Sequence, residues 1–197
     1  MGKLILVRHG HTHLDEGGEN KRLRGCLDVP LDEQGMKEAV ETAQRVSGYP
    51  VEKLFSSDLR RARHLAELIK EHTDAPIIST TELRPWDLGV FAGQRICDVL
   101  PFLEVLNQHP ELAAPSGESF YHFYGRYSHR LTKLMTLAED SSGCVVAVTH
   151  HRNLLATPTI INHGDRDRIP VSGGAKADTL FVVEKQDGKW SILRSDS

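Results

Sequence analysis

Residues 3–10 read Lys3-Leu4-Ile5-Leu6-Val7-Arg8-His9-Gly10, a short apolar run that ends in an arginine, a histidine and a glycine. This pattern is typical of a strand buried on both faces and followed by a turn that a glycine assists. A second run, residues 144–149, is rich in β-branched residues and leads directly into His150 and His151. Two buried strands are therefore expected to end in histidines.

Strand-like and helix-like patterns alternate along the rest of the chain. The predicted strands cover residues 3–7, 53–56, 76–79 and 144–149, and the predicted helices cover residues 33–46, 59–69, 120–137 and 153–161. Asp32 and Ser119 are expected to cap two of these helices, and Ser57 or Asp58 a third. Residues 80–93 are predicted to form an irregular loop, and residues 94–109 short helices.

The last part of the chain carries a hairpin signal. Apolar runs at residues 179–183 and 190–193 flank Asp187-Gly188, a dipeptide typical of a hairpin turn. Together with the repeated order of strand then helix, this signal predicts an α/β fold. We expect a mostly parallel sheet with helices on both faces and an antiparallel edge hairpin.

Length and composition indicate a single globular domain. The 197 residues are 39% hydrophobic and 26% charged, which is typical of one folded unit with a buried core. We expect one domain over residues 1–197, with a helical insert over roughly residues 80–140. The 24 basic and 27 acidic residues give a net charge of −3, so no overall basic field attracts nucleic acid or an anionic membrane.

Cysteine content and hydropathy favour a cytoplasmic protein. Cys26, Cys97 and Cys144 are odd in number and widely spaced, which favours neither a disulfide framework nor a Cys-rich zinc site. The N-terminal apolar run is too short for a signal peptide, and no stretch approaches the length of a transmembrane helix. The pattern leaves the oligomeric state open.

The carboxyl ends of the predicted strands carry the side chains with the most chemistry. Ligands of parallel α/β sheets bind beyond these ends. The segments expected there are Arg8-His9, residues 56–61, residues 80–93 and His150-His151. Basic and imidazole groups thus converge, although the pattern alone does not distinguish among Arg60, Arg61 and Arg63.

Such a group of side chains is suited to phosphoryl transfer. Two guanidinium groups can hold a phosphoryl dianion without a metal, and they stabilise the charge that the transition state spreads over its oxygens. A neutral imidazole can attack phosphorus when its other nitrogen donates to a backbone carbonyl. A second histidine, protonated, would complete the anion pocket.

Five segments occur in an order and at spacings that match one family. They are Arg8-His9-Gly10, then Arg24-Gly25 with residues 28–31, then residues 56–62, then Pro115-Ser116-Gly117-Glu118-Ser119, and finally the strand that ends at His150. In these segments the chain resembles the histidine phosphatase superfamily, also called the phosphoglycerate mutase-like fold. The resemblance covers most of the chain. It implies that His9 is the phosphorylated nucleophile with His150 as its partner, and that Arg8 and Arg61 are the phosphate ligands. The other residues that it places at the pocket are Thr12, Arg24, Gly25 and His151.

One departure from the family concerns the general acid. Relatives commonly carry a glutamate two residues after the position of Leu83, but this chain has Pro85, which cannot transfer a proton. We expect Asp87, beside a tryptophan, to replace it, because a carboxyl in such surroundings can stay protonated. Glu82 and Glu118 are weaker candidates.

A second departure is Asp15, which stands where relatives often place asparagine. A negative charge beside the phosphate normally opposes anion binding. Either Asp15 points away from the phosphate, or the substrate brings its own cation.

The function expected from these observations is hydrolysis of small phosphomonoesters through a phosphohistidine, with no metal or cofactor and a small phosphorylated metabolite as substrate. Mutases that resemble this chain are usually longer, with a segment that excludes water, so a mutase-type phosphotransferase is the second alternative. A silent phosphate-binding module is the third, because of Pro85. The fourth is a metal site built from His9, His11 and His13 with the later histidine pair, although Gly10 indicates a turn that would separate the first two rings.

Overall fold

The computed structural model describes residues 2–15, 17–166 and 180–196. Its centre is a six-stranded sheet in the order β3-β2-β4-β1-β5-β6. The strands are β1 (Lys3–Arg8), β2 (Val51–Ser57), β3 (Ile77–Thr80), β4 (Cys144–Thr149), β5 (Leu180–Gln186) and β6 (Lys189–Asp196). The first four run parallel, and β5 pairs antiparallel with both β1 and β6. The predicted α/β class and antiparallel edge are confirmed.

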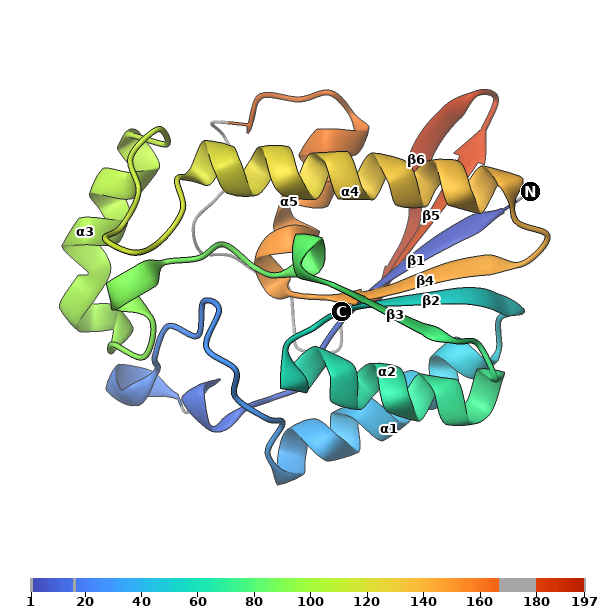
Figure 1. Cartoon of the computed structure of the whole chain (residues 1–197), viewed down its shortest axis with the longest axis horizontal. Helices are drawn as coiled ribbons and strands as arrows, with labels where there is room; N and C mark the ends of the chain where they lie inside the picture. Colours follow the sequence, from blue (N-terminus) through green and yellow to red (C-terminus); the bar gives the residue numbers. More distant parts are fainter. Residues whose placement is uncertain (1, 16, 167–179, 197) are drawn as a thin grey trace.

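Helices cover both faces of the sheet (Figure 1). On one face lie α1 (Glu33–Ser47) and α2 (Arg60–Thr73), and on the other lie α4 (Phe120–Asp140) and α5 (His151–Ile161). The two faces of β1 reach separate cores, since Leu4 and Leu6 belong to the cluster under α4, and Ile5 and Val7 to the one under α1 and α2. The strand is therefore buried on both sides, as its continuous apolar run predicts. Among the described helices, none is both long and apolar enough to cross a membrane.

Two helix caps match the sequence-based prediction, and a third does not. The Asp32 side chain accepts from the Gly35 N–H at 2.8 Å, and Ser119 accepts from the His122 N–H at 3.2 Å. The expected Ser57 or Asp58 cap of α2 is wrong. Leu59 occupies the cap position without a side-chain bond, and the Asp58 carboxylate is bound by Arg84 instead.

The region between β3 and α4 contains one long helix that the sequence did not predict. Residues 80–93 form two short 3-10 turns, η3 (Thr81–Leu83) and η4 (Gly89–Phe91), joined by irregular backbone. Residues 94–109, expected as short helices, instead form the single helix α3 (Ile96–Gln108) despite its internal Pro101. Burial of Val99, Leu103 and Leu106 along one face stabilises α3 as a continuous helix.

The predicted hairpin is confirmed and is longer than its apolar runs. Asp187 and Gly188 have φ values of 49° and 79°, so both central residues of the turn are left-handed. Two left-handed central residues match the twist of the flanking strands, which is why Asp-Gly favours this turn. Thr179, at the start of the predicted strand, lies outside the described residues.

Candidate active site

His9 and His150 lie side by side at the carboxyl ends of the two central strands. In the parallel register Arg8 is opposite Thr149, so the next residue of each strand reaches the same level. The two ring centroids are 5.0 Å apart with an angle of 62° between the planes, and the residues are 1% and 2% exposed. The convergence predicted for these two histidines is present.

The hydrogen bonds of His9 determine which nitrogen is free for chemistry. Its Nδ1 lies 2.7 Å from the carbonyl oxygen of Gly10, an oxygen that can only accept, so Nδ1 carries the proton. Its Nε2 then accepts from the Nε–H of Arg61 at 3.2 Å. The lone pair of Nε2 therefore faces a cation. This arrangement suits a nucleophile that attacks an anionic group, because the cation can bind that group.

Arg61, in the first turn of α2, is the arginine that enters the site. It is 1% exposed, whereas Arg60 and Arg63 are exposed. Its Nη1 and Nη2 groups donate to the carbonyls of Leu27 at 2.6 Å and Gly25 at 2.9 Å, which fixes the guanidinium with its Nε edge toward His9. Burial, followed by the nearby charge of Arg24, lowers the Arg61 pKa to about 10, so the group stays charged at neutral pH.

Asp15 forms an ion pair with Arg24. Its charge therefore requires neither that the side chain point away from the phosphate nor that the substrate bring a cation. Its carboxylate pairs with Arg24 and accepts both the N–H and the Oγ–H of Thr12 at 3.0 Å. The negative charge is thus compensated inside the protein, so the substrate need not bring a cation. The Thr12 hydroxyl, fully buried, is occupied by Asp15. Burial lowers the pKa of Arg24, and the charge of Asp15 opposes that shift.

Burial and the surrounding positive charges favour neutral imidazoles in this site. Burial lowers the pKa of both His9 and His150 well below 6.5, and Arg61 is the next cause in each case. For His151, burial followed by the charges of Arg8 and Arg24 lowers the pKa to about 4. Burial and the surrounding guanidinium charges thus disfavour a protonated His150, and its protonation in the anion pocket stays a prediction. A phosphate dianion would offset those positive charges.

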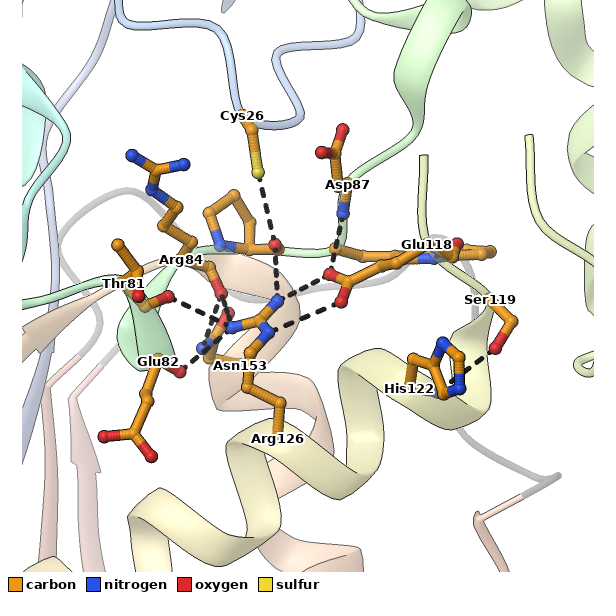
Figure 2. A network of polar contacts seen from close by, with 12 residues as sticks. Cys26, Thr81, Glu82, Arg84, Asp87, Glu118, Ser119, His122, Arg126 and Asn153 are labelled. Atoms are coloured by element: carbon orange, nitrogen blue, oxygen red, sulfur yellow. Dashed lines mark hydrogen bonds and ion pairs between the residues drawn. The ribbon is translucent and has the colours of Figure 1, made fainter. Parts of the chain in front are cut away.

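The three acid candidates differ in what binds their carboxylates (Figure 2). Glu82 lies 3.5 Å from Arg130 and points away from Asp87, and Glu118 is bound at both oxygens by Arg126. Asp87 points to the side opposite Arg126, and its Oδ1 accepts from the Gly89 N–H at 3.0 Å. Within the described part of the chain, Asp87 is the candidate whose carboxylate has no ion-pair partner.

Three polar residues around this loop were not identified from the sequence. Arg126 binds the backbone of residues 81–85, and Asn153 donates to the carbonyls of Leu83 and Arg84 at 3.3 Å. Arg152 lies over the rings of Trp86 and Phe120, and burial lowers its pKa to about 10. The available signal for Arg126 was its position beside the apolar stripe of α4.

The histidines considered for a metal site turn to different partners. His9 binds the Gly10 carbonyl, His11 pairs with Asp32 at 2.5 Å, and His13 is exposed. In residues 2–15, 17–166 and 180–196, no group of three or more His, Cys, Asp or Glu side chains is arranged to hold a metal ion. The geometry does not favour the metal-site alternative.

Comparison with known proteins agrees with this geometry. The family model of the histidine phosphatase superfamily (branch 1) matches residues 4–196, and the chain belongs to that family. A probable phosphoglycerate mutase, GpmB, of Proteus mirabilis is 30% identical over 152 residues, covering 75% of this chain and 69% of the relative. An uncharacterized phosphatase, PhoE, of Bacillus subtilis is 27% identical, covering 98% of this chain and 93% of the relative. The structure of a mycobacterial glucosyl-3-phosphoglycerate phosphatase superposes with a TM-score of 0.80 at 24% identity, covering 98% of this chain and 97% of the other.

Proposed function

We propose that this protein is a metal-independent phosphatase that hydrolyses small phosphomonoesters through a phosphohistidine at His9. The observation that carries this proposal is the state of His9: Nδ1 donates to the Gly10 carbonyl, which leaves the Nε2 lone pair facing the Arg61 guanidinium. An imidazole arranged in this way is a neutral nucleophile beside a ready phosphate ligand.

The anion site would be formed by groups from four segments. Arg8 ends β1, Arg61 lies in the first turn of α2, and His150 precedes the first turn of α5. The free N–H groups at the start of α5 favour negative charge at the same place. Arg24 pairs with Asp15, and its charge adds to the effects of burial and of Arg61 in lowering the pKa of both His9 and His150. Gly25 and His151 are proposed to line this pocket.

In the proposed first step, Nε2 of His9 attacks phosphorus and the bond to the ester oxygen breaks. The electron pair of that bond stays on the oxygen, which takes a proton from the Asp87 carboxyl and leaves as an alcohol. In the second step, water attacks phosphorus, the P–N bond breaks with its electron pair returning to His9, and the Asp87 carboxylate takes the proton of the water. Phosphate leaves, and the starting protonation states are restored.

Hydrolysis is preferred over mutase chemistry because the match to the phosphatase relative PhoE extends over nearly the whole of both chains. The GpmB relative, matched over a smaller share of each chain, keeps phosphoglycerate mutase as the second candidate. The two are separated by incubating the protein with a phosphoglycerate. A phosphatase releases inorganic phosphate, whereas a mutase moves the phosphoryl group between hydroxyls.

The direct test is a panel of phosphorylated metabolites assayed with the native protein and with His9→Ala. We expect the native protein to release phosphate and His9→Ala to release none. The native activity should persist in EDTA and should be inhibited competitively by vanadate. Loss of activity in EDTA would contradict the metal-free mechanism, and phosphate release by His9→Ala would contradict the role of His9 as the nucleophile.

The proposed location of the protein is the cytoplasm, a reducing compartment in which the free thiols Cys26, Cys97 and Cys144 stay reduced.

A further inference from the structure

Arg126 binds the loop that carries Asp87 through an unusual number of backbone contacts (Figure 2). Its guanidinium donates to the carbonyl oxygens of Thr81 at 3.4 Å, Glu82 at 3.0 Å, Arg84 at 3.1 Å and Pro85 at 3.2 Å. These carbonyls follow the end of β3 and lie outside the sheet ladder, and Arg126 supplies a donor to each of them. One side chain of α4 thereby fixes the backbone just before Asp87.

The same guanidinium fixes the loop from the other side through Glu118. Arg126 donates to both oxygens of the Glu118 carboxylate, at 2.5 and 3.4 Å. Glu118 in turn accepts the Asp87 N–H on its Oε1 at 3.1 Å, and its own N–H donates to the Asp87 carbonyl at 3.0 Å. Its carbonyl also accepts from the Trp86 indole at 2.9 Å. Three bonds therefore tie residues 86 and 87 to Glu118.

Pro85 explains why the loop depends on these side-chain contacts. Proline has no N–H, so the loop cannot be held by an amide at that position. The contacts of Arg126 extend from Thr81 to the Pro85 carbonyl, those of Glu118 are to residues 86 and 87, and the two side chains form one ion pair. The Asp87 carboxylate is directed away from Arg126; among the described residues it has no ion-pair partner, and its Oδ1 accepts from the Gly89 N–H.

We propose that Arg126 and Glu118 are positioning residues, which hold the Asp87 carboxyl where it protonates the leaving oxygen. This inference rests on the proposed phosphatase function. In this proposal neither residue contacts the substrate. Their effect is confined to proton transfer, which matters for a poor leaving group and little for a good one. A positional error of about 1 Å in a catalytic group can cost ~10²-fold in rate.

The test compares Arg126→Lys with the native protein on two substrates, p-nitrophenyl phosphate and an alkyl phosphate. Lysine keeps the charge beside Glu118 but cannot donate to four carbonyls at once. We expect kcat on the alkyl phosphate to fall by about 10-fold or more relative to kcat on the aryl phosphate. Glu118→Gln, which keeps an acceptor for the Asp87 N–H, should give a smaller change in the same ratio.

Two further variants distinguish positioning from general damage. Arg130 lies one turn later on α4, 3.5 Å from the Glu82 carboxylate and over the Phe55 ring, and has no bond to residues 84–87 among those described. Arg130→Lys should therefore leave the ratio unchanged. In the background of Asp87→Asn, Arg126→Lys should have no further effect on the ratio, because the proton that it positions is gone.

Equal loss of both rates in Arg126→Lys, an unchanged ratio, or a further effect in the Asp87→Asn background would overturn the positioning role. Failure of the proposed function is distinct, because the native protein would then hydrolyse neither substrate. Thermal unfolding of each variant identifies any that does not fold, and Glu118→Gln then carries the test in place of Arg126→Lys.

Discussion

The Nε–H of Arg61 points at Nε2 of His9 across 3.2 Å, so the proposed nucleophile and a phosphate-binding cation share one edge of the site. A phosphoryl group that enters must come between them, with an oxygen taking the N–H of Arg61 and phosphorus facing the lone pair. The same proximity helps to keep His9 neutral, since the charge of Arg61 is the second cause, after burial, of its lowered pKa.

Arg61 should be indispensable for turnover. We expect Arg61→Ala to lower kcat/KM by about 10³-fold, equivalent to ~4 kcal/mol of transition-state stabilisation. The loss has two sources, the missing charge and the freed carbonyls of Gly25 and Leu27. Arg63→Ala is the matched control, because that side chain is exposed and binds only Glu67 on its own helix among the described residues. Steady-state kinetics with a similar, small effect of both substitutions would contradict this role.

Stability should depend on pH through the buried imidazoles. Below the ordinary pKa of 6.5, unfolded histidines bind protons that His9, His150 and, down to about pH 4, His151 do not bind in the folded protein. The unfolded state therefore gains protons, and the free energy of unfolding falls as the pH falls below 6.5. Urea denaturation between about pH 7.5 and about pH 5 measures this slope. His150→Gln should make the slope shallower, and an unchanged slope would show that His150 titrates normally.

The loop of His9 packs on α1 with no room for a methyl group. A Cβ on Gly35 would lie 2.0 Å from the carbonyl oxygen of His11, and one on Gly10 would lie 2.5 Å from that of Gly35. Gly35→Ala should therefore destabilise the fold by about 1–3 kcal/mol and lower activity further by displacing the backbone that orients His9. Gly125 of α4 has open space around it, so Gly125→Ala should stabilise the fold by about 0.5–1 kcal/mol. Chemical denaturation of both variants checks the contrast, and equal effects would contradict it.

The sheet and the proximity of the histidine pair could be predicted from sequence because they depend on local signals. Continuous apolar runs marked β1 and β4, and the parallel register then placed His9 beside His150. The choice of Arg61 also had a local signal that composition alone does not reveal. Arg61 shares the buried face of α2 with Leu65 and Ile69, four and eight residues later.

The remainder depended on contacts between distant residues. The cap of α2 was wrong because Asp58 is bound by Arg84, 26 residues away. Arg126 was missed because four of its partners are backbone carbonyls 41 to 45 residues earlier in the chain. Every residue has such a carbonyl, so the residue types do not reveal which ones a side chain binds. Short helices were expected over residues 94–109, whereas burial of one face keeps α3 continuous across Pro101.

Trapping the phosphoryl group during turnover tests directly whether His9 is the nucleophile. The native protein is mixed with a ³²P-labelled substrate, quenched in alkali, and the labelled peptide is identified. We predict an acid-labile, alkali-stable phosphoryl group on Nε2 of His9, absent in His9→Ala and present in Arg63→Ala. Turnover without a labelled intermediate, or a label on any residue other than His9, would contradict the mechanism.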